Sequence, residues 1–215
     1  MKIIITGSLG NISKPLTEKL VQKGHSVTVI SSNRERQKDI EALGATAAIG
    51  SLEDVDFLTK SFTGADAVYC MMPFNFKDPD LIGWFKKISN NYARSIQKAG
   101  IKRAIVLSGW AAGVINSYKD IETIFNELSD ASVTHIRPGY FYSNFYDSID
   151  MIKEKGMLAA TFGGEDRIVF SAPTDIADVI VTEIFSPDSG NKVRYVASDE
   201  MTCNEAAKII GTAIG

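Results

Sequence analysis

The sequence predicts a doubly wound α/β fold, in which helices cover both faces of one parallel sheet. Three observations support this prediction. Short apolar runs alternate with amphipathic stretches through the first part of the chain, up to residue 137. The apolar runs are continuous and rich in Val, Ile and Ala, as in strands that are buried on both faces. The first run leads directly into a turn with two glycines, which a helical stretch follows.

Strands and helices are expected in strict alternation up to residue 137. The strands are expected at residues 2–6, 26–31, 46–49, 67–71, 103–107 and 133–137. The helices between them are expected at about residues 11–23, 35–43, 55–62, 80–99 and 119–129. Crossover connections of this kind are right-handed, so we expect the strand order 3-2-1-4-5-6.

The alternation weakens after residue 137. The pattern there predicts helices at residues 144–155 and 174–185, and a strand at residues 192–197. Gly163 and Gly164 indicate a loop or hairpin within residues 157–170. Thr202 and Glu205 have the spacing of a capping box, which predicts a last helix from Cys203 onward.

Composition restricts the class of protein. The chain has 215 residues, of which 45% are hydrophobic and 23% charged, as in globular domains. Its apolar runs are too short for a membrane span or a signal peptide. The net charge of -3 argues against direct binding to nucleic acid. Two cysteines and two histidines, far apart, suggest neither a metal site nor a disulfide framework. We therefore expect a reduced, cytoplasmic protein without a metal.

The turn after the first strand has the composition of a dinucleotide phosphate site. Gly7 permits a tight turn, and Gly10 lets the backbone approach a pyrophosphate at the helix N-terminus. Ser13 stands at the usual third glycine position and is small enough for close packing of helix on strand. An ordinary glycine turn is the alternative. The residues expected to bind the cofactor here are Gly7, Ser8, Leu9, Gly10, Asn11 and Ile12.

The end of the second strand favours NADP(H) over NAD(H). An NAD-specific site carries Asp or Glu there to bind the ribose 2′-hydroxyl, but the first acidic residue is Glu35, at the start of the next helix. Ser32, Asn33 and Arg34 instead offer donors to a 2′-phosphate. NAD(H) and a solvated helix start without a ligand are the alternatives.

Several motifs together resemble the NmrA-like family of atypical short-chain dehydrogenases/reductases. They are the turn at residues 6–13, the strand at 67–71 leading into Met72-Pro73, the segment Ile136-Arg137-Pro138-Gly139-Tyr140-Phe141, and Thr174-Asp175-Ile176-Ala177-Asp178-Val179. The resemblance covers the whole chain. It implies an NADP(H)-binding Rossmann core at residues 1–143 and an interleaved C-terminal substrate region at residues 144–215. Members usually continue further, so we expect that region to be incomplete.

The resemblance also suggests catalytic residues. Typical short-chain reductases carry Tyr-x-x-x-Lys on one helix face. Counted back from Thr134, the family's lysine falls on Lys119, and Ile115 stands where the tyrosine should be. Ether reductases of the family also lack the tyrosine and use the lysine as acid or base. Ser108 lies where short-chain reductases place a substrate-polarising serine, and Gly109 where many have a second serine. We therefore predict Lys119 as ribose anchor and catalytic residue and Ser108 as catalytic residue. The alternative for Lys119 is a solvated lysine in a first helical turn, and the alternatives for Ser108 are a cap of the chain end or a contact with the ribose.

Two further segments are expected beside the cofactor, because the family places them there. The first, at the carboxyl end of the fourth strand, is Met71, Met72 and Pro73, for which a simple transition from core to loop is the alternative. The second is Tyr140 and Phe141, which begin an aromatic cluster that continues with Tyr142, Phe145 and Tyr146. A role in the hydrophobic core is the alternative for the cluster.

The expected function is reduction of a small apolar carbonyl, quinone or enone by NADPH. A regulator that binds NADP(H) without turnover, and recognises a partner protein, is the main alternative. A sugar-nucleotide epimerase is a further alternative, against which the missing tyrosine argues.

Overall fold

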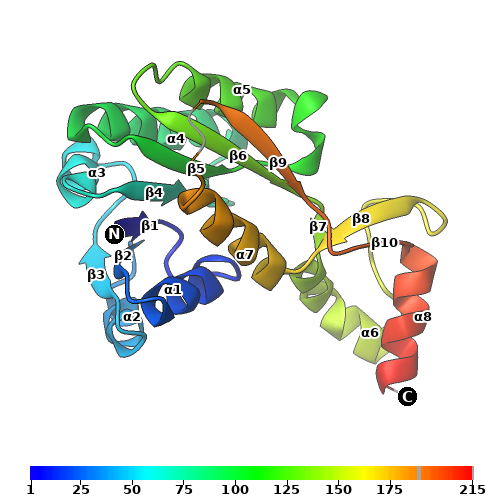
Figure 1. Cartoon of the computed structure of the whole chain (residues 1–215). Coiled ribbons are helices and arrows are strands. Elements are labelled where there is room, and N and C mark those ends of the chain that lie inside the picture. Colours follow the sequence, from blue (N-terminus) through cyan, green and yellow to red (C-terminus); the bar gives the residue numbers. More distant parts are fainter. Residues whose placement is uncertain (188–189, 215) are drawn as a thin grey trace.

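The computed structural model describes residues 1–187 and 190–214 (Figure 1). Its main sheet has seven parallel strands in the order β3-β2-β1-β4-β5-β6-β9. The predicted order is thereby confirmed, and β9 extends it at the β6 edge. The strands are β1 (Lys2–Ile5), β2 (Ser26–Ser31), β3 (Thr46–Ile49), β4 (Ala67–Cys70), β5 (Arg103–Leu107), β6 (Ser132–Pro138) and β9 (Lys192–Val196).

Two hydrophobic cores lie on opposite faces of this sheet. Because side chains alternate along a strand, Ile3 and Ile5 of β1 enter one core and Ile4 enters the other, and all three are fully buried. The first core is covered by α1 (Ser13–Gln22), α2 (Gln37–Ala42) and α7 (Pro173–Ile184). The second is covered by α3 (Val55–Phe62), α4 (Leu81–Ala99) and α5 (Asn116–Asn126). Burial on both faces explains why the strands read as continuous apolar runs.

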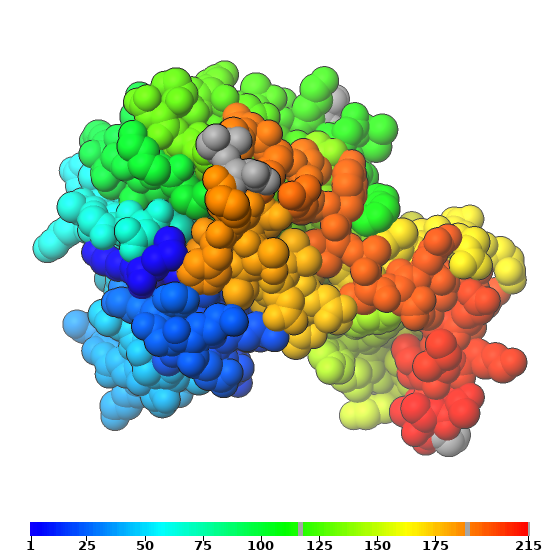
Figure 2. Space-filling model, in the orientation of Figure 1, coloured from blue at the N-terminus to red at the C-terminus, as the bar shows by residue number. Residues whose placement is uncertain are grey.

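A second, smaller unit projects from the main body, as Figure 2 shows in yellow and red. It contains a three-stranded sheet of β10 (Asp199–Thr202), β8 (Arg167–Ser171) and β7 (Tyr140–Phe141), with α6 (Ile149–Lys155) and α8 (Cys203–Ile214) beside it. α7 and β9 return to the large sheet, so the chain is interleaved between the two units. The division at residue 143 stays a prediction.

Several local predictions can be compared directly with the structure. The capping box is confirmed: the Thr202 amide donates to Glu205 Oε2 at 2.8 Å, and the Glu205 amide donates to Thr202 Oγ1 at 3.1 Å. The loop around Gly163 is present, but β8 follows it and pairs with the distant β10 instead of forming a local hairpin. Short 3₁₀ helices at Arg34–Arg36 and Tyr142–Ser148 shift two predicted helix boundaries, and a third 3₁₀ helix forms at Trp110–Gly113. Among the described residues, no helix is long and apolar enough to cross a membrane.

Candidate active site

A tight turn joins β1 to α1 at the carboxyl edge of the sheet. Gly7 and Ser8 have left-handed backbones, with φ of 90° and 54°. A Cβ on Gly7 would lie 2.7 Å from Ser13 Oγ and 2.8 Å from Met71 Cγ, so a side chain would not fit there. The Ser13 hydroxyl donates to the Thr6 carbonyl at 2.8 Å and holds the start of α1 against the end of β1. No side chain caps α1, so this turn fits the pyrophosphate of a dinucleotide.

The end of β2 is hydrogen-bonded to this turn through Ser31. The Ser8 hydroxyl donates to Ser31 Oγ at 2.9 Å, and the Asn33 amide donates to the same oxygen at 3.2 Å. Asn33 Oδ1 accepts from the Glu35 amide at 2.9 Å, which leaves its amide hydrogens for a ligand. Arg34 is exposed, and within the described chain its guanidinium makes no ion pair. The predicted contacts of Ser32, Asn33 and Arg34 with a 2′-phosphate stay a prediction.

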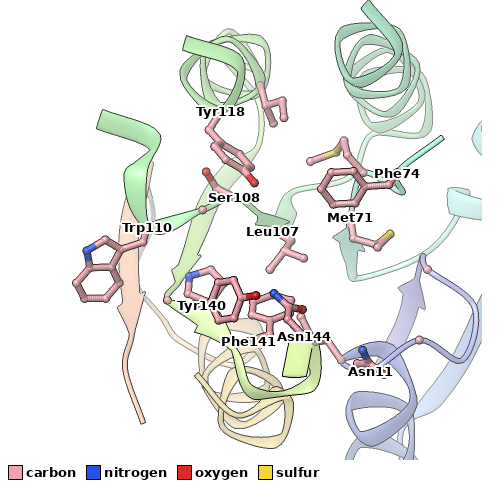
Figure 3. Close-up of a pocket in the computed structure, with 18 of the residues that line it drawn as sticks. Asn11, Met71, Phe74, Leu107, Ser108, Trp110, Tyr118, Tyr140, Phe141 and Asn144 are labelled. Carbon is pink, nitrogen blue, oxygen red and sulfur yellow. The ribbon is translucent and has the colours of Figure 1, made fainter. Parts of the chain in front are cut away.

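A cavity of about 600 Å³ extends from the phosphate-binding turn along the carboxyl ends of the central strands (Figure 3). The structure brings nine of the predicted site residues to its wall: Gly7, Gly10, Asn11, Ile12, Met71, Met72, Ser108, Tyr140 and Phe141. Others do not line it: Ser8, Leu9, Ser32, Asn33, Arg34, Pro73 and Lys119. Residues that were predicted as cofactor or catalytic residues from separate parts of the sequence therefore line one continuous space, and their roles stay predictions.

The wall of this cavity is uncharged. Among the described residues that line it there is no Asp, Glu, Lys, Arg or His. Its polar groups are hydroxyls and amides, including those of Asn11, Ser108, Tyr118 and Asn144 (Figure 3). Since a buried charge needs a partner, a wall of this kind favours a neutral ligand beyond the phosphate-binding turn.

The helix α5 presents Tyr118 to the cavity, whereas the adjacent Lys119 is exposed. Neighbouring residues on a helix point about 100° apart, so the two cannot share one direction. A Cβ on Gly109 would lie 3.0 Å from the Tyr118 ring, which explains why a second serine is absent there. Burial raises the pKa of Tyr118, so its hydroxyl keeps its proton. The catalytic role of Lys119 stays a prediction that its position does not support.

Ser108 lines the cavity, but its hydroxyl donates its hydrogen bond to a residue outside the cavity wall. Its hydroxyl donates to Glu122 Oε1 at 2.6 Å. Arg137 holds the same carboxylate, with Nε 2.8 Å from Oε1 and Nη2 2.6 Å from Oε2. Desolvation raises the pKa of Glu122, but the hydrogen bonds from Arg137 and Ser108 outweigh it, so this pKa is lower than usual. An ionised carboxylate only accepts, so the single hydrogen of Ser108 is committed to Glu122. The predicted polarisation of a substrate by Ser108 thus lacks a free hydrogen.

Sequence reasoning did not identify Tyr118, Glu122 or Arg137 as site residues. Tyr118 and Glu122 are four residues apart and share one face of α5, which is the spacing of the usual dyad with Glu in place of Lys. Arg137 also donates from Nη1 to the Tyr195 hydroxyl at 2.6 Å, so three of its nitrogens are engaged. The network therefore fixes the wall of the cavity without placing a charge inside it.

The aromatic cluster after β6 has two roles. Tyr140 and Phe141 line the cavity, and their predicted contact with the cofactor stays a prediction. Tyr142 and Phe145 instead pack on the fully buried Phe170, with ring centroids 5.4 and 5.6 Å away. These two side chains therefore belong to the aromatic packing of the smaller unit, as the core alternative expects.

The strand order and the glycine turn at the first strand–helix connection together define a dinucleotide-binding protein of the Rossmann class. A model of the NAD(P)H-binding family matches residues 7–187, and the chain belongs to that family. This confirms the predicted relationship to the NmrA-like, atypical short-chain dehydrogenases/reductases.

Individual relatives are more distant. The NAD(P)H azoreductase of Xenophilus azovorans is 22% identical over 99% of this chain and 74% of its own length. The NADP(H) complex of Citrobacter sp. triphenylmethane reductase has a TM-score of 0.82 at 17% identity, over 99% of this chain and 75% of that one. The NADPH complex of an Escherichia coli NADPH-dependent quinone oxidoreductase has a TM-score of 0.84 at 19% identity, with 99% and 75% covered. Curated relatives at 30–35% identity match only 20–23% of their own length.

Proposed function

We propose that the protein is an NADP(H)-dependent reductase that passes a hydride to a neutral, apolar acceptor such as a quinone, an enone or a similar carbonyl. The observation that carries this proposal is the uncharged cavity that continues from the phosphate-binding turn to Tyr118. The names of the relatives agree with it, since an azoreductase, a triphenylmethane reductase and a quinone oxidoreductase are all reductases.

The cofactor is held at its phosphate end by the backbone of residues 7–12 and the N-terminus of α1. The donors of Ser32, Asn33 and Arg34 select the 2′-phosphate of NADP(H). Bound NADPH supplies the hydride. Met71, Leu107 and Phe141 contribute apolar surface that excludes water from the space between cofactor and acceptor.

Reduction of a carbonyl or quinone also needs a proton, and Tyr118 is placed to donate it. No described residue is hydrogen-bonded to its hydroxyl, and its ring lines the cavity. Its raised pKa keeps it protonated at neutral pH. Ser108 orients the wall through Glu122 and does not polarise the acceptor. After transfer, Tyr118 regains its proton from water that enters as the product leaves.

The uncharged wall argues against a sugar-nucleotide substrate. The diphosphate of such a substrate would need Lys, Arg or main-chain donors of its own, beyond those that hold the cofactor. Among the described residues, the cavity wall offers no cation for that purpose.

The test is oxidation of NADPH, followed at 340 nm, with 1,4-benzoquinone, 1,4-naphthoquinone and an aliphatic enone as acceptors. Conversion of UDP-glucose to its epimer is followed in a separate assay. The proposal expects saturable turnover with the neutral acceptors and none with UDP-glucose. Tight NADPH binding, measured by calorimetry, without turnover of any acceptor would contradict it and favour a cofactor-sensing regulator with a protein partner.

A further inference from the structure

Two exposed phenylalanines stand on the loop between β4 and α4. Phe74 is 57% exposed and Phe76 is 88% exposed. Their rings lie nearly parallel, at 9°, with centroids 5.6 Å apart. Phe74 also meets the buried Phe85 edge to face, with centroids 5.3 Å apart. Apolar rings exposed to this extent are costly in water, so a surface of this kind points to a ligand.

The loop is held in place at both ends. The Met71 carbonyl accepts from the Tyr92 hydroxyl at 3.0 Å, and the Pro73 carbonyl accepts from the Trp84 indole N–H at 2.8 Å. At the other end, Asp80 caps the first turn of α4. The backbone that carries the two rings is therefore fixed before a ligand arrives, which lowers the entropy lost on binding.

Phe74 connects this surface to the cavity. It lines the cavity together with Met72 and Phe85, and Figure 3 shows its ring across the cavity from Tyr140, with Met71 beside it. Phe76 stacks on Phe74 but is not among the described lining residues. An aromatic surface thus begins inside the cavity, near the hydride acceptor site of the proposed function, and continues to its mouth.

We propose that Phe74 is a stacking subsite for the second and third rings of a planar, polycyclic acceptor. This inference rests on the proposed function and specifies its substrate class: neutral polycyclic quinones and aryl ketones, in preference to single-ring or aliphatic carbonyls. Aromatic faces attract one another beyond the area that they bury, and an acceptor whose reacting ring lies near Tyr118 can extend further rings onto Phe74. The uncharged wall admits such a molecule without desolvating a charge.

The overall reaction balances without a further reagent. Hydride transfer from NADPH converts the quinone to the hydroquinone monoanion. The Tyr118 hydroxyl then protonates the second oxygen and gives the neutral hydroquinone. The cofactor leaves as NADP⁺, and Tyr118 recovers its proton from water.

The test compares Phe74→Leu with the unmodified protein, using 1,4-benzoquinone and 9,10-phenanthrenequinone as acceptors. Leucine keeps an apolar side chain but removes the aromatic face. We expect the KM for phenanthrenequinone to rise about 3- to 10-fold more than the KM for benzoquinone. Phe185→Leu is the matched control: Phe185 is 39% exposed, packs on His25 and does not line the cavity, so it should change neither KM.

Equal changes in both KM values, or no change, would overturn the subsite. If neither quinone is turned over, the KM values cannot be compared, and binding decides the subsite separately. The proposed function itself fails only if the enone is not reduced either. In that case 2-methoxynaphthalene and anisole are titrated against the protein with NADP⁺ present. A preference for the two-ring probe that Phe74→Leu abolishes supports the subsite, and a preference that survives, or no preference, overturns it.

Discussion

The assignment of the proton donor to Tyr118 can be tested by two substitutions on adjacent residues of α5. Tyr118→Phe removes one oxygen and keeps the ring that packs on Gly109. No described residue is hydrogen-bonded to that hydroxyl, so its removal leaves no partner group unpaired. Lys119→Met removes an exposed charge that forms no ion pair within the same residues, and it should change stability by no more than about 0.5 kcal/mol.

The two variants should differ strongly in rate. A positioned general acid contributes roughly 10²- to 10⁴-fold, which corresponds to about 2.7–5.4 kcal/mol of activation free energy. We therefore expect Tyr118→Phe to lower kcat by about that factor with little change in KM, and Lys119→Met to leave kcat within about twofold. The resemblance to ether reductases predicts the reverse, since it assigns the proton transfer to Lys119.

The assay is steady-state NADPH oxidation with a neutral carbonyl acceptor, together with NADPH titration of each variant by fluorescence. The titration controls for cofactor binding, which neither substitution should weaken by more than about twofold if Tyr118 acts on the acceptor alone. Turnover that survives Tyr118→Phe and falls in Lys119→Met would refute the placement of the donor on Tyr118. A large fall in kcat in both variants would mean that the rate depends on the structure of this part of α5 and not on the Tyr118 hydroxyl alone.

Three further outcomes follow from other parts of the structure. Arg34→Ala should weaken NADPH binding by about 10- to 100-fold, because a charge-assisted hydrogen bond is worth about 1.5–3 kcal/mol, and it should leave NADH binding unchanged. Titration of each cofactor measures both affinities, and Lys38→Ala, on the exposed side of the next helix, is the control. Ser108→Ala should lower kcat less than about 10-fold, since its hydrogen is bonded to a carboxylate, and a loss of 10²-fold or more would contradict this. Burial lowers the pKa of His135 to about 4, whereas an unfolded histidine has a pKa of about 6.5. As the pH falls below about 6.5, the unfolded chain therefore binds a proton that the folded chain does not, and the folded state loses stability. Between pH 7 and pH 5 the free energy of unfolding, measured with urea, should fall by about 2 kcal/mol, and His135→Gln should abolish this fall.

The main sheet could be predicted because each of its central strands is apolar on both faces. Ile3, Ile4 and Ile5 illustrate this, since every one is buried and no register ambiguity arises. The smaller sheet carries no such pattern. β10 is Asp-Glu-Met-Thr and is a strand only because it pairs with β8, about thirty residues earlier in the chain. A strand that forms only by pairing with a distant, half-exposed segment has no periodic pattern in its own sequence, so it could not be predicted.

The phosphate-binding turn could be predicted because it depends on local backbone geometry. Gly7 has no room for a side chain, and Ser13 is small enough to hold the start of α1 against β1. The catalytic side was harder, because it depends on the rotation of a helix. The predicted start of α5 at residue 119 is three residues later than the observed start at Asn116. A count of residues from Thr134 could select Lys119, but only the packing of α5 against α4 and β6 determines that Tyr118 faces the cavity.

The electrostatics around Tyr118 lead to one more expected outcome, which concerns pH. In the usual dyad a lysine one turn away lowers the tyrosine pKa and lets the tyrosine act as acid and as base. Here Glu122 occupies that place, and its charge is neutralised by Arg137, so within the described cavity wall no cation stabilises a tyrosinate. Burial then raises the pKa of Tyr118 above its ordinary value.

A hydroxyl of this kind stays protonated, so the tyrosinate that would act as base in the reverse reaction is scarcely populated. We therefore expect kcat for reduction to be constant between pH 6 and pH 9, because Tyr118 stays protonated throughout that range, and oxidation of the corresponding alcohol by NADP⁺ to be slow across it. A decline in the reduction rate with an apparent pKa between 6 and 9 would show that a cation lowers the pKa of the donor, as a lysine does in the usual dyad. Repeating the profile with Lys119→Met would then identify that cation, since the decline should disappear if Lys119 turns toward Tyr118 when cofactor is bound.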